Sequence, residues 1–143
     1  MKGIYEMKKL STGIITIFVI VGLLSGCAST KLANSFDKDT VVKVSKQVIS
    51  YLNVGDYASA CGMLQEDLQD DLTQDQLKEA VKKTYGDAGK FIKYKNATII
   101  GQKNKTLKED SAVAVIVAKY EKKKVIFTIS FNKDMKMISL YMR

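Results

Sequence analysis

The first half of the chain places apolar residues at helical spacing. Val41, Val44, Val48 and Leu52 recur every three or four positions, which predicts one amphipathic helix over residues 38–53. Gly55 suits a left-handed helix end, and Asp56 suits the N-cap of a second helix over residues 57–68. Thr73 and Gln76 have the spacing of a capping box, so we expect a third helix that ends at residue 85, with Gly86 as its cap.

From residue 90 onward the pattern changes to alternation and becomes rich in β-branched residues. "FIKYKNATIIGQ", "SAVAVIVAKY", "KVIFTISF" and "KMISLYM" each read as a strand. The alternation of the first slips at Lys95 and Asn96, which predicts a bulge there. Turns are expected at residues 121–123 and 132–135, and a loop at residues 103–110. Helices followed by an antiparallel meander predict an α+β domain, with three helices packed on one face of a four-stranded sheet.

An apolar run precedes this domain and ends in a processing motif. Lys8 and Lys9 precede an eleven-residue apolar stretch, which leads to Leu24-Ser25-Gly26-Cys27. A helix of that length covers roughly 16 Å of a hydrocarbon layer about 30 Å thick, so we expect a secretory signal rather than a stable membrane span. Whether translation starts at Met1 or at Met7 stays open.

The motif at its end resembles a lipobox, the processing site of bacterial lipoproteins. The resemblance implies cleavage between Gly26 and Cys27 and a diacylglyceryl group on the Cys27 thiol. The expected organisation is a signal peptide at 1–26, a tether at 27–36 and the domain at 37–143. The expected location is the extracytoplasmic face of the cell membrane, held there by two acyl chains.

The helical half also resembles a family of small secreted bacterial domains of unknown function. The matching positions are the Gly55-Asp56-Tyr57 turn, the opening of the third helix from Leu72 to Leu77, and Gly89 with Phe91. The resemblance implies the cone-shaped fold of nuclear transport factor 2, also called cystatin-like, with a curved sheet around helices. It transfers no catalytic residues, because this architecture hosts enzymes and binding modules alike.

The composition of the chain excludes several kinds of catalytic and metal-binding site. The chain has no histidine and two cysteines, so histidine-based catalytic triads, imidazole zinc sites and multi-cysteine clusters are excluded. Cys61 reads as a small buried hydrophobe, and the acids between Glu66 and Asp75 lack the spacing of a calcium loop. We expect no metal and no cofactor.

Charge is divided unevenly along the chain. Residues 56–79 hold seven acidic residues and one lysine, whereas residues 90–143 hold thirteen basic and four acidic residues. Lys122, Lys123 and Lys124 form a turn that either keeps the sheet soluble or contacts an anionic lipid or wall polymer. Nucleic acid is not expected as the partner of an exported chain.

The strand at 111–120 is apolar on both faces, because Val113, Val115 and Val117 alternate with alanine and isoleucine. The second face is therefore either buried inside the domain or an interface with a partner. The candidate residues of a pocket or interface are Tyr57, Phe91, Val113, Val115, Val117, Phe127 and Tyr141.

Three functions remain. We expect a tethered, non-catalytic binding or accessory module whose partner is a protein, a wall polymer or a small ligand. The alternatives are a structural homodimer and, less favoured, an enzyme with an acid such as Asp110 or Asp134 beside a tyrosine.

Overall fold

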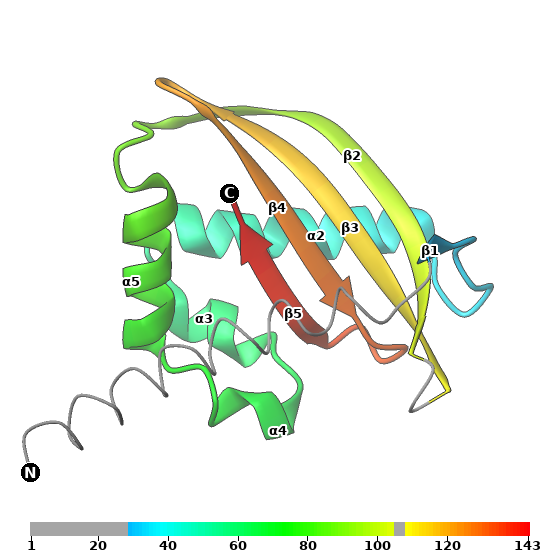
Figure 1. Ribbon diagram of the computed structural model, residues 1–143. Coiled ribbons are helices and arrows are strands. Elements are labelled where there is room, and N and C mark those ends of the chain that lie inside the picture. The colour runs from blue at the N-terminus through cyan, green and yellow to red at the C-terminus, as the bar shows by residue number, and fades with distance from the viewer. Residues whose placement is uncertain (1–28, 105–107) are drawn as a thin grey trace, which may run out of the picture.

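The computed structural model describes residues 29–104 and 108–143. A two-residue strand comes first, then four helices, then four longer strands (Figure 1). The elements are β1 Ser29–Thr30, α2 Lys38–Asn53, α3 Tyr57–Gly62, α4 Glu66–Gln69, α5 Gln74–Tyr85, β2 Phe91–Asn104, β3 Glu109–Tyr120, β4 Lys124–Phe131 and β5 Met137–Met142. The predicted α+β class, with N-terminal helices packed on an antiparallel sheet of four long strands, is confirmed, and the two-residue strand β1 adds a fifth strand at the edge of that sheet.

Helix α2 has the predicted limits. Asp37 is its N-cap, and its carboxylate accepts a hydrogen bond of 2.8 Å from the Thr40 amide. Gly55, two residues beyond the helix, adopts a φ of 74°, as the predicted left-handed end requires. The buried stripe of the helix is Val41, Ser45, Val48, Ile49 and Leu52.

The second predicted helix is wrong in its length, because it divides into α3 and α4. The chain leaves the helical path at Leu64, which forms a parallel bridge with Met137 of β5. The Met137 amide donates to the Met63 carbonyl at 2.8 Å, and the Gln65 amide donates to the Met137 carbonyl at 2.9 Å. These bonds use backbone groups that a continuous helix would need for itself.

Helix α5 begins at the predicted capping box. The Thr73 hydroxyl accepts from the Gln76 amide at 3.2 Å, and the Gln76 side chain accepts from the Thr73 amide at 2.9 Å. The helix ends at Tyr85, as expected. Gly86 follows with a φ of −59°, so the cap is right-handed.

The sheet has the order β1-β2-β3-β4-β5, and every neighbouring pair is antiparallel. The predicted bulge is confirmed, since the β2–β3 register shifts between Tyr94 and Asn96 and leaves Lys95 without a partner. The predicted turns at 121–123 and 132–135 lie between strands. The expected loop at 103–110 is shorter, because β2 extends to Asn104 and β3 begins at Glu109.

One face of the sheet, here called the inner face, packs against the helices. Alternation along β4 predicts that Phe127, Ile129 and Phe131 share this face, and all three are fully buried there. Alternation along β5 predicts that Ile138, Leu140 and Met142 share the face that meets the helices, and this prediction is wrong for Ile138. A register shift beside Phe131 puts Met137 in the core instead, since Met137 pairs with Phe131 and Leu140 pairs with Ile129.

The segment expected as a tether differs from that expectation over its described part. Thr30 pairs with Gly101 of β2, Leu32 and Ala33 pack on the core, and Phe36 is buried. The domain therefore includes residues from 29 onward. Figure 1 shows β1 beside β2 at one edge of the sheet, with α2 running behind the strands.

Candidate functional site

The proposed processing site lies outside the described residues. Gly26 and Cys27 belong to the part of the chain before Ser29. Ser29 itself is the first residue of β1 and pairs with Gln102. Cys27 therefore precedes an element of the sheet by two residues in the sequence.

One of the three lysines in the β3–β4 turn makes contacts within the folded domain. The Lys123 ammonium donates to the Thr84 carbonyl at 2.8 Å and forms an ion pair of 3.0 Å with Asp87. The hydrogen bond from Lys123 lowers the pKa of the Asp87 carboxyl. Lys122 and Lys124 are exposed and remain the two side chains of this turn that could contact an anionic partner.

The same turn is held against the connection between α5 and β2. The Glu121 carboxylate accepts from the Lys90 amide at 2.9 Å. Gly89 has a φ of 80°, and a Cβ there would lie 2.5 Å from that carboxylate. The left-handed backbone and the close carboxylate therefore require glycine at this crossing, which explains why Gly89 is among the positions that carry the family resemblance.

The seven candidate pocket or interface residues do not form one site. Phe127 is fully buried on the inner face, and Tyr57 packs at its margin at the start of α3. Phe91 is 36% exposed at the start of β2. The remaining four lie on the opposite face: Val113, Val115, Val117 and Tyr141.

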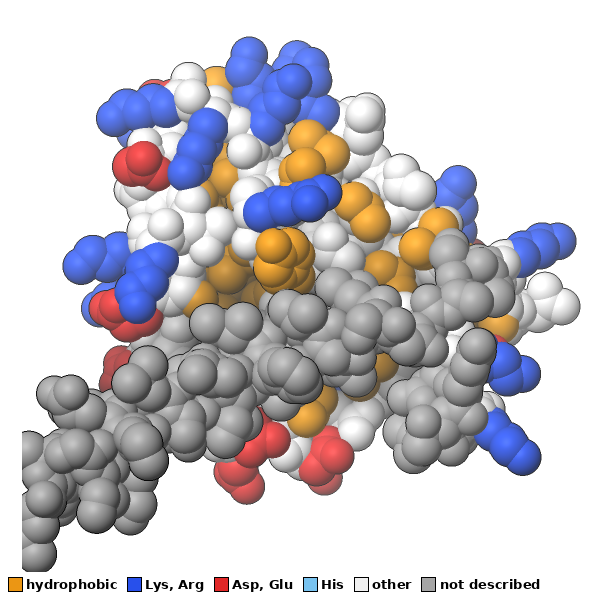
Figure 2. Space-filling view, in the orientation of Figure 1, with side chains coloured by type: hydrophobic (Ala, Val, Ile, Leu, Met, Phe, Trp, Pro, Cys, Tyr) orange, Lys and Arg blue, Asp and Glu red, His pale blue; other side chains and the backbone are white. Residues whose placement is uncertain are grey.

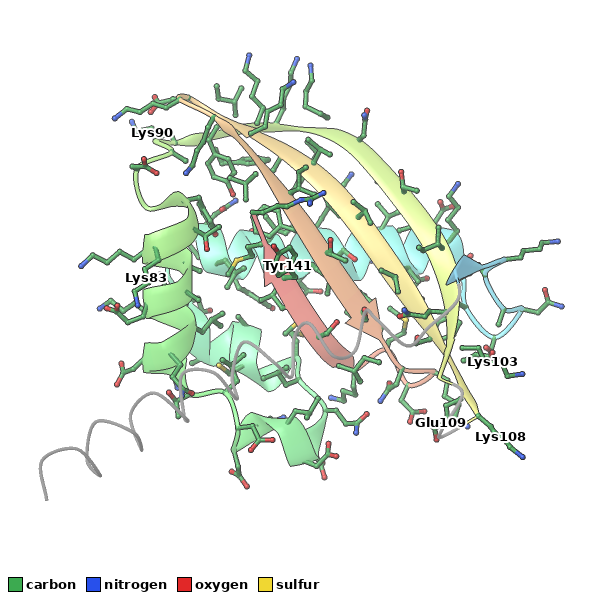
Figure 3. The ribbon with its side chains drawn as sticks, viewed as in Figure 1. Lys83, Lys90, Lys103, Lys108, Glu109 and Tyr141 are labelled. Atoms are coloured by element: carbon green, nitrogen blue, oxygen red, sulfur yellow. The ribbon has the colours of Figure 1, made fainter. Side chains whose placement is uncertain are left out.

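That opposite face, here called the outer face, continues across the four strands β2 to β5. Its centre consists of Ile100, Val113, Val115, Val117, Ile126, Thr128, Ser130 and Tyr141, paired across the sheet by register. Val113 and Ser130 are buried and Tyr141 is 36% exposed. The described helices pack on the inner face, so the outer face is the sheet's second surface. Apolar side chains are visible on it in Figure 2, and Tyr141 is labelled in Figure 3.

An aromatic cluster that sequence reasoning missed closes one end of the core. The ring of Tyr85 lies 5.2 Å from that of Tyr120 and 5.6 Å from that of Phe127, and Phe91 lies 5.7 Å from Tyr120 and 4.8 Å from Tyr94. Tyr85 follows Leu77 and Val81 at steps of four residues, so its burial was readable from periodicity. Its contact with Tyr120, 35 positions away in the sequence, was not.

The hydroxyls of this cluster differ in their partners. Tyr120 donates to the Asn53 side chain, whereas the buried Tyr85 hydroxyl has no hydrogen-bond partner among the described residues. Burial raises the pKa of Tyr120 to about 12 and also raises the pKa of Tyr85. Both groups therefore stay neutral at physiological pH and act as packing and hydrogen-bonding groups.

The remaining candidates lie at the surface or are inert. Burial raises the pKa of the Cys61 thiol, which lies 3.6 Å from the Leu72 carbonyl. Asp110 and Asp134 are exposed. Within residues 29–104 and 108–143, no three acidic, cysteine or histidine side chains come together as a metal site, and no helix has the length and hydropathy to cross a bilayer.

Comparison with known proteins places these features in a family. Residues 45–140 match the family described as "Protein of unknown function (DUF3887)". An NMR structure of a protein from Ruminococcus gnavus ATCC 29149 is similar, with a TM-score of 0.69 and 27% sequence identity over 79% of this chain and 96% of that chain. No curated protein matches the sequence.

Proposed function

We propose that this chain, which belongs to the DUF3887 family of proteins of unknown function, is a bacterial lipoprotein that holds a small binding domain at the outer surface of the cytoplasmic membrane. Leu24-Ser25-Gly26-Cys27, after a charged start and a short apolar run, supports lipidation of Cys27 and cleavage before it. The proposal includes the nuclear transport factor 2-like fold, which the curved sheet in front of α2 supports.

The single observation that carries the proposal is the position of β1. The lipobox cysteine is followed by one residue and then by a strand that is part of the sheet. Two residues extend at most about 7 Å. An acylated Cys27 therefore brings the folded domain close to the headgroups, with no long spacer between them.

A binding role is favoured over catalysis by where the acidic side chains lie. A pocket enzyme of this fold needs an acid that burial tunes beside its substrate. Among the described residues, the carboxylates are exposed except that of Asp56, and the Asp56 side chain accepts a hydrogen bond from the Ser59 amide at the start of α3. The surfaces that remain for a partner are the outer face and the exposed lysines of the sheet.

Cell fractionation with the two cysteines as a matched pair tests the anchor. We expect the wild-type chain and Cys61→Ser to sediment with membranes, and Cys27→Ser to keep its signal peptide and run at a higher mass. An inhibitor of the lipoprotein signal peptidase should reproduce that higher mass in the wild type. A Cys27→Ser chain that is cleaved and distributed like the wild type would contradict the proposal.

A structural homodimer is the second candidate, and the outer face is the observation that favours it. Two copies could cover their apolar strand centres against each other. Sedimentation of the purified chain in detergent distinguishes the two functions. A stable dimer that Val115→Lys dissociates would favour the structural role.

A further inference from the structure

We propose that the β2 edge of the sheet faces the bilayer, and that Lys93, Lys95 and Lys103 contact anionic lipid headgroups there. This inference rests on the proposed lipidation of Cys27 and adds an orientation to it. The interaction surface is defined by the exposed basic side chains of β2 together with Lys31, which follows β1.

The sheet order determines which edge lies nearest to the anchor. Among the described strands, β1 is the outermost, and it pairs with β2 at Gly101 and Gln102. The chain that leads back to Cys27 therefore leaves from the β2 edge. β5 lies four strand spacings away, about 19 Å, which exceeds the roughly 10 Å over which salt screens surface charges.

The segment that follows β1 is held against the sheet and the core. A Cβ at Gly101 would lie 2.3 Å from the Lys31 carbonyl oxygen, so the backbone after β1 crosses β2 in direct contact. Leu32 and Ala33 then pack on the core, and Phe36 is buried. A short link to a fixed strand restricts how the domain can tilt over the membrane.

The charge of β2 suits an anionic surface. Its fourteen residues include three lysines and no acidic residue, and all three lysines are exposed. The strand also carries Ile92, which is 50% exposed beside Lys93. Basic side chains beside an exposed apolar one suit the interface between headgroups and acyl chains.

A second copy of the chain is disfavoured as the occupant of this edge. Pairing two β2 edges would bring lysines together in both strands, and such lysines are a known protection against edge pairing. Lys122 and Lys124 lie at the end of the sheet where β2 begins, because Lys93 pairs with Lys119 of β3 and Lys119 pairs with Lys124 of β4. Lys124 therefore stands two strand spacings, about 10 Å, back from β2, so we expect it to contact headgroups less than the lysines of β2 itself.

The test measures lysine protection in the diacylated protein, inserted from outside into preformed vesicles. Vesicles of phosphatidylcholine alone are compared with vesicles that also contain phosphatidylglycerol. Amine acylation is followed residue by residue with peptide mass spectrometry. We expect Lys93, Lys95 and Lys103 to react about fivefold more slowly on the anionic vesicles, which corresponds to about 1 kcal/mol for each basic residue at a charged surface.

Two triple variants provide the matched comparison. Lys93→Gln, Lys95→Gln and Lys103→Gln together should abolish the slower reaction at Lys31. Lys83→Gln, Lys133→Gln and Lys136→Gln remove the same charge from α5 and from the β4–β5 turn, and should leave it intact. Figure 3 places Lys103 beside β1 and Lys83 on the outside of α5.

The outcomes separate the two proposals. Unmodified Cys27 in the purified protein would overturn both. A diacylated protein in which Lys122 and Lys124 are protected more strongly than the β2 lysines, or in which no β2 lysine is protected, would overturn the orientation alone. Equal protection on both kinds of vesicle, or chemical crosslinks between β2 strands of two molecules, would also overturn it.

Discussion

Thr30 pairs with Gly101, and this contact joins the start of the described chain to the edge of the sheet. The two residues are 71 positions apart in the sequence. Because the backbone of Lys31 lies against Gly101, the contact depends on the lack of a side chain at that glycine.

Gly101→Val should therefore release the β1 segment. The added side chain would meet the Lys31 carbonyl, so we expect the free energy of unfolding to fall by about 1–3 kcal/mol and the amides of residues 30–33 to exchange faster. Gly62→Ala is the control, because a Cβ there would meet no atom within 4 Å. Equal exchange in the two variants would show that β1 is not held by this crossing.

The two buried tyrosines should differ in how the loss of the hydroxyl changes the stability of the protein. Tyr120→Phe removes a hydrogen bond to Asn53 and should cost about 1 kcal/mol in urea unfolding. Tyr85→Phe removes a buried hydroxyl without a partner among the described residues, so it should leave stability unchanged or raise it. A larger loss for Tyr85→Phe than for Tyr120→Phe would contradict this assignment.

Alkaline pH should weaken the fold through the same pair. Burial raises the pKa of Tyr120 to about 12, above the value of roughly 10 in the unfolded chain. The unfolded state then loses its proton first, so the stabilisation is complete below pH ~10 and is lost as the pH rises toward ~12. We expect the stability of Tyr120→Phe to fall less over this window than that of the wild type. The measurement is thermal unfolding at each pH, together with tyrosinate absorbance.

Met137 should contribute more to stability than its neighbour. Its side chain is fully buried and its backbone holds the break between α3 and α4, whereas Ile138 is half-buried and outside the core cluster. Met137→Ala should cost about 2–5 kcal/mol in unfolding experiments, with a smaller loss for Ile138→Ala. A reversed order would mean that the register of β5 differs from that described.

Local signals in the sequence predicted the parts of the fold that local contacts determine. Asp37, Gly55 and Thr73 each act within four residues, so the ends of α2 and the start of α5 could be read directly. The irregular alternation at Lys95 likewise predicted the bulge at that position.

The features of the fold that the sequence did not predict depend on contacts between residues far apart in the chain. The helix break at Leu64 depends on Met137, and the two-residue strand β1 depends on Gly101, so neither carries a periodic pattern. For the candidate site, the sequence contains the lysines of β2 but does not indicate that the segment after Cys27 pairs with their strand. The same limit applied to the aromatic cluster around Tyr85 and Tyr120.

The most direct measurement of the central proposal is the mass of the N-terminal peptide of the protein purified from bacterial membranes. We predict that this peptide begins at Cys27 and carries a diacylglyceryl group on its sulfur. Mild oxidation would then convert the thioether of Cys27 to a sulfoxide. A peptide in which residues 1–26 are still attached and the Cys27 thiol is free would contradict the account.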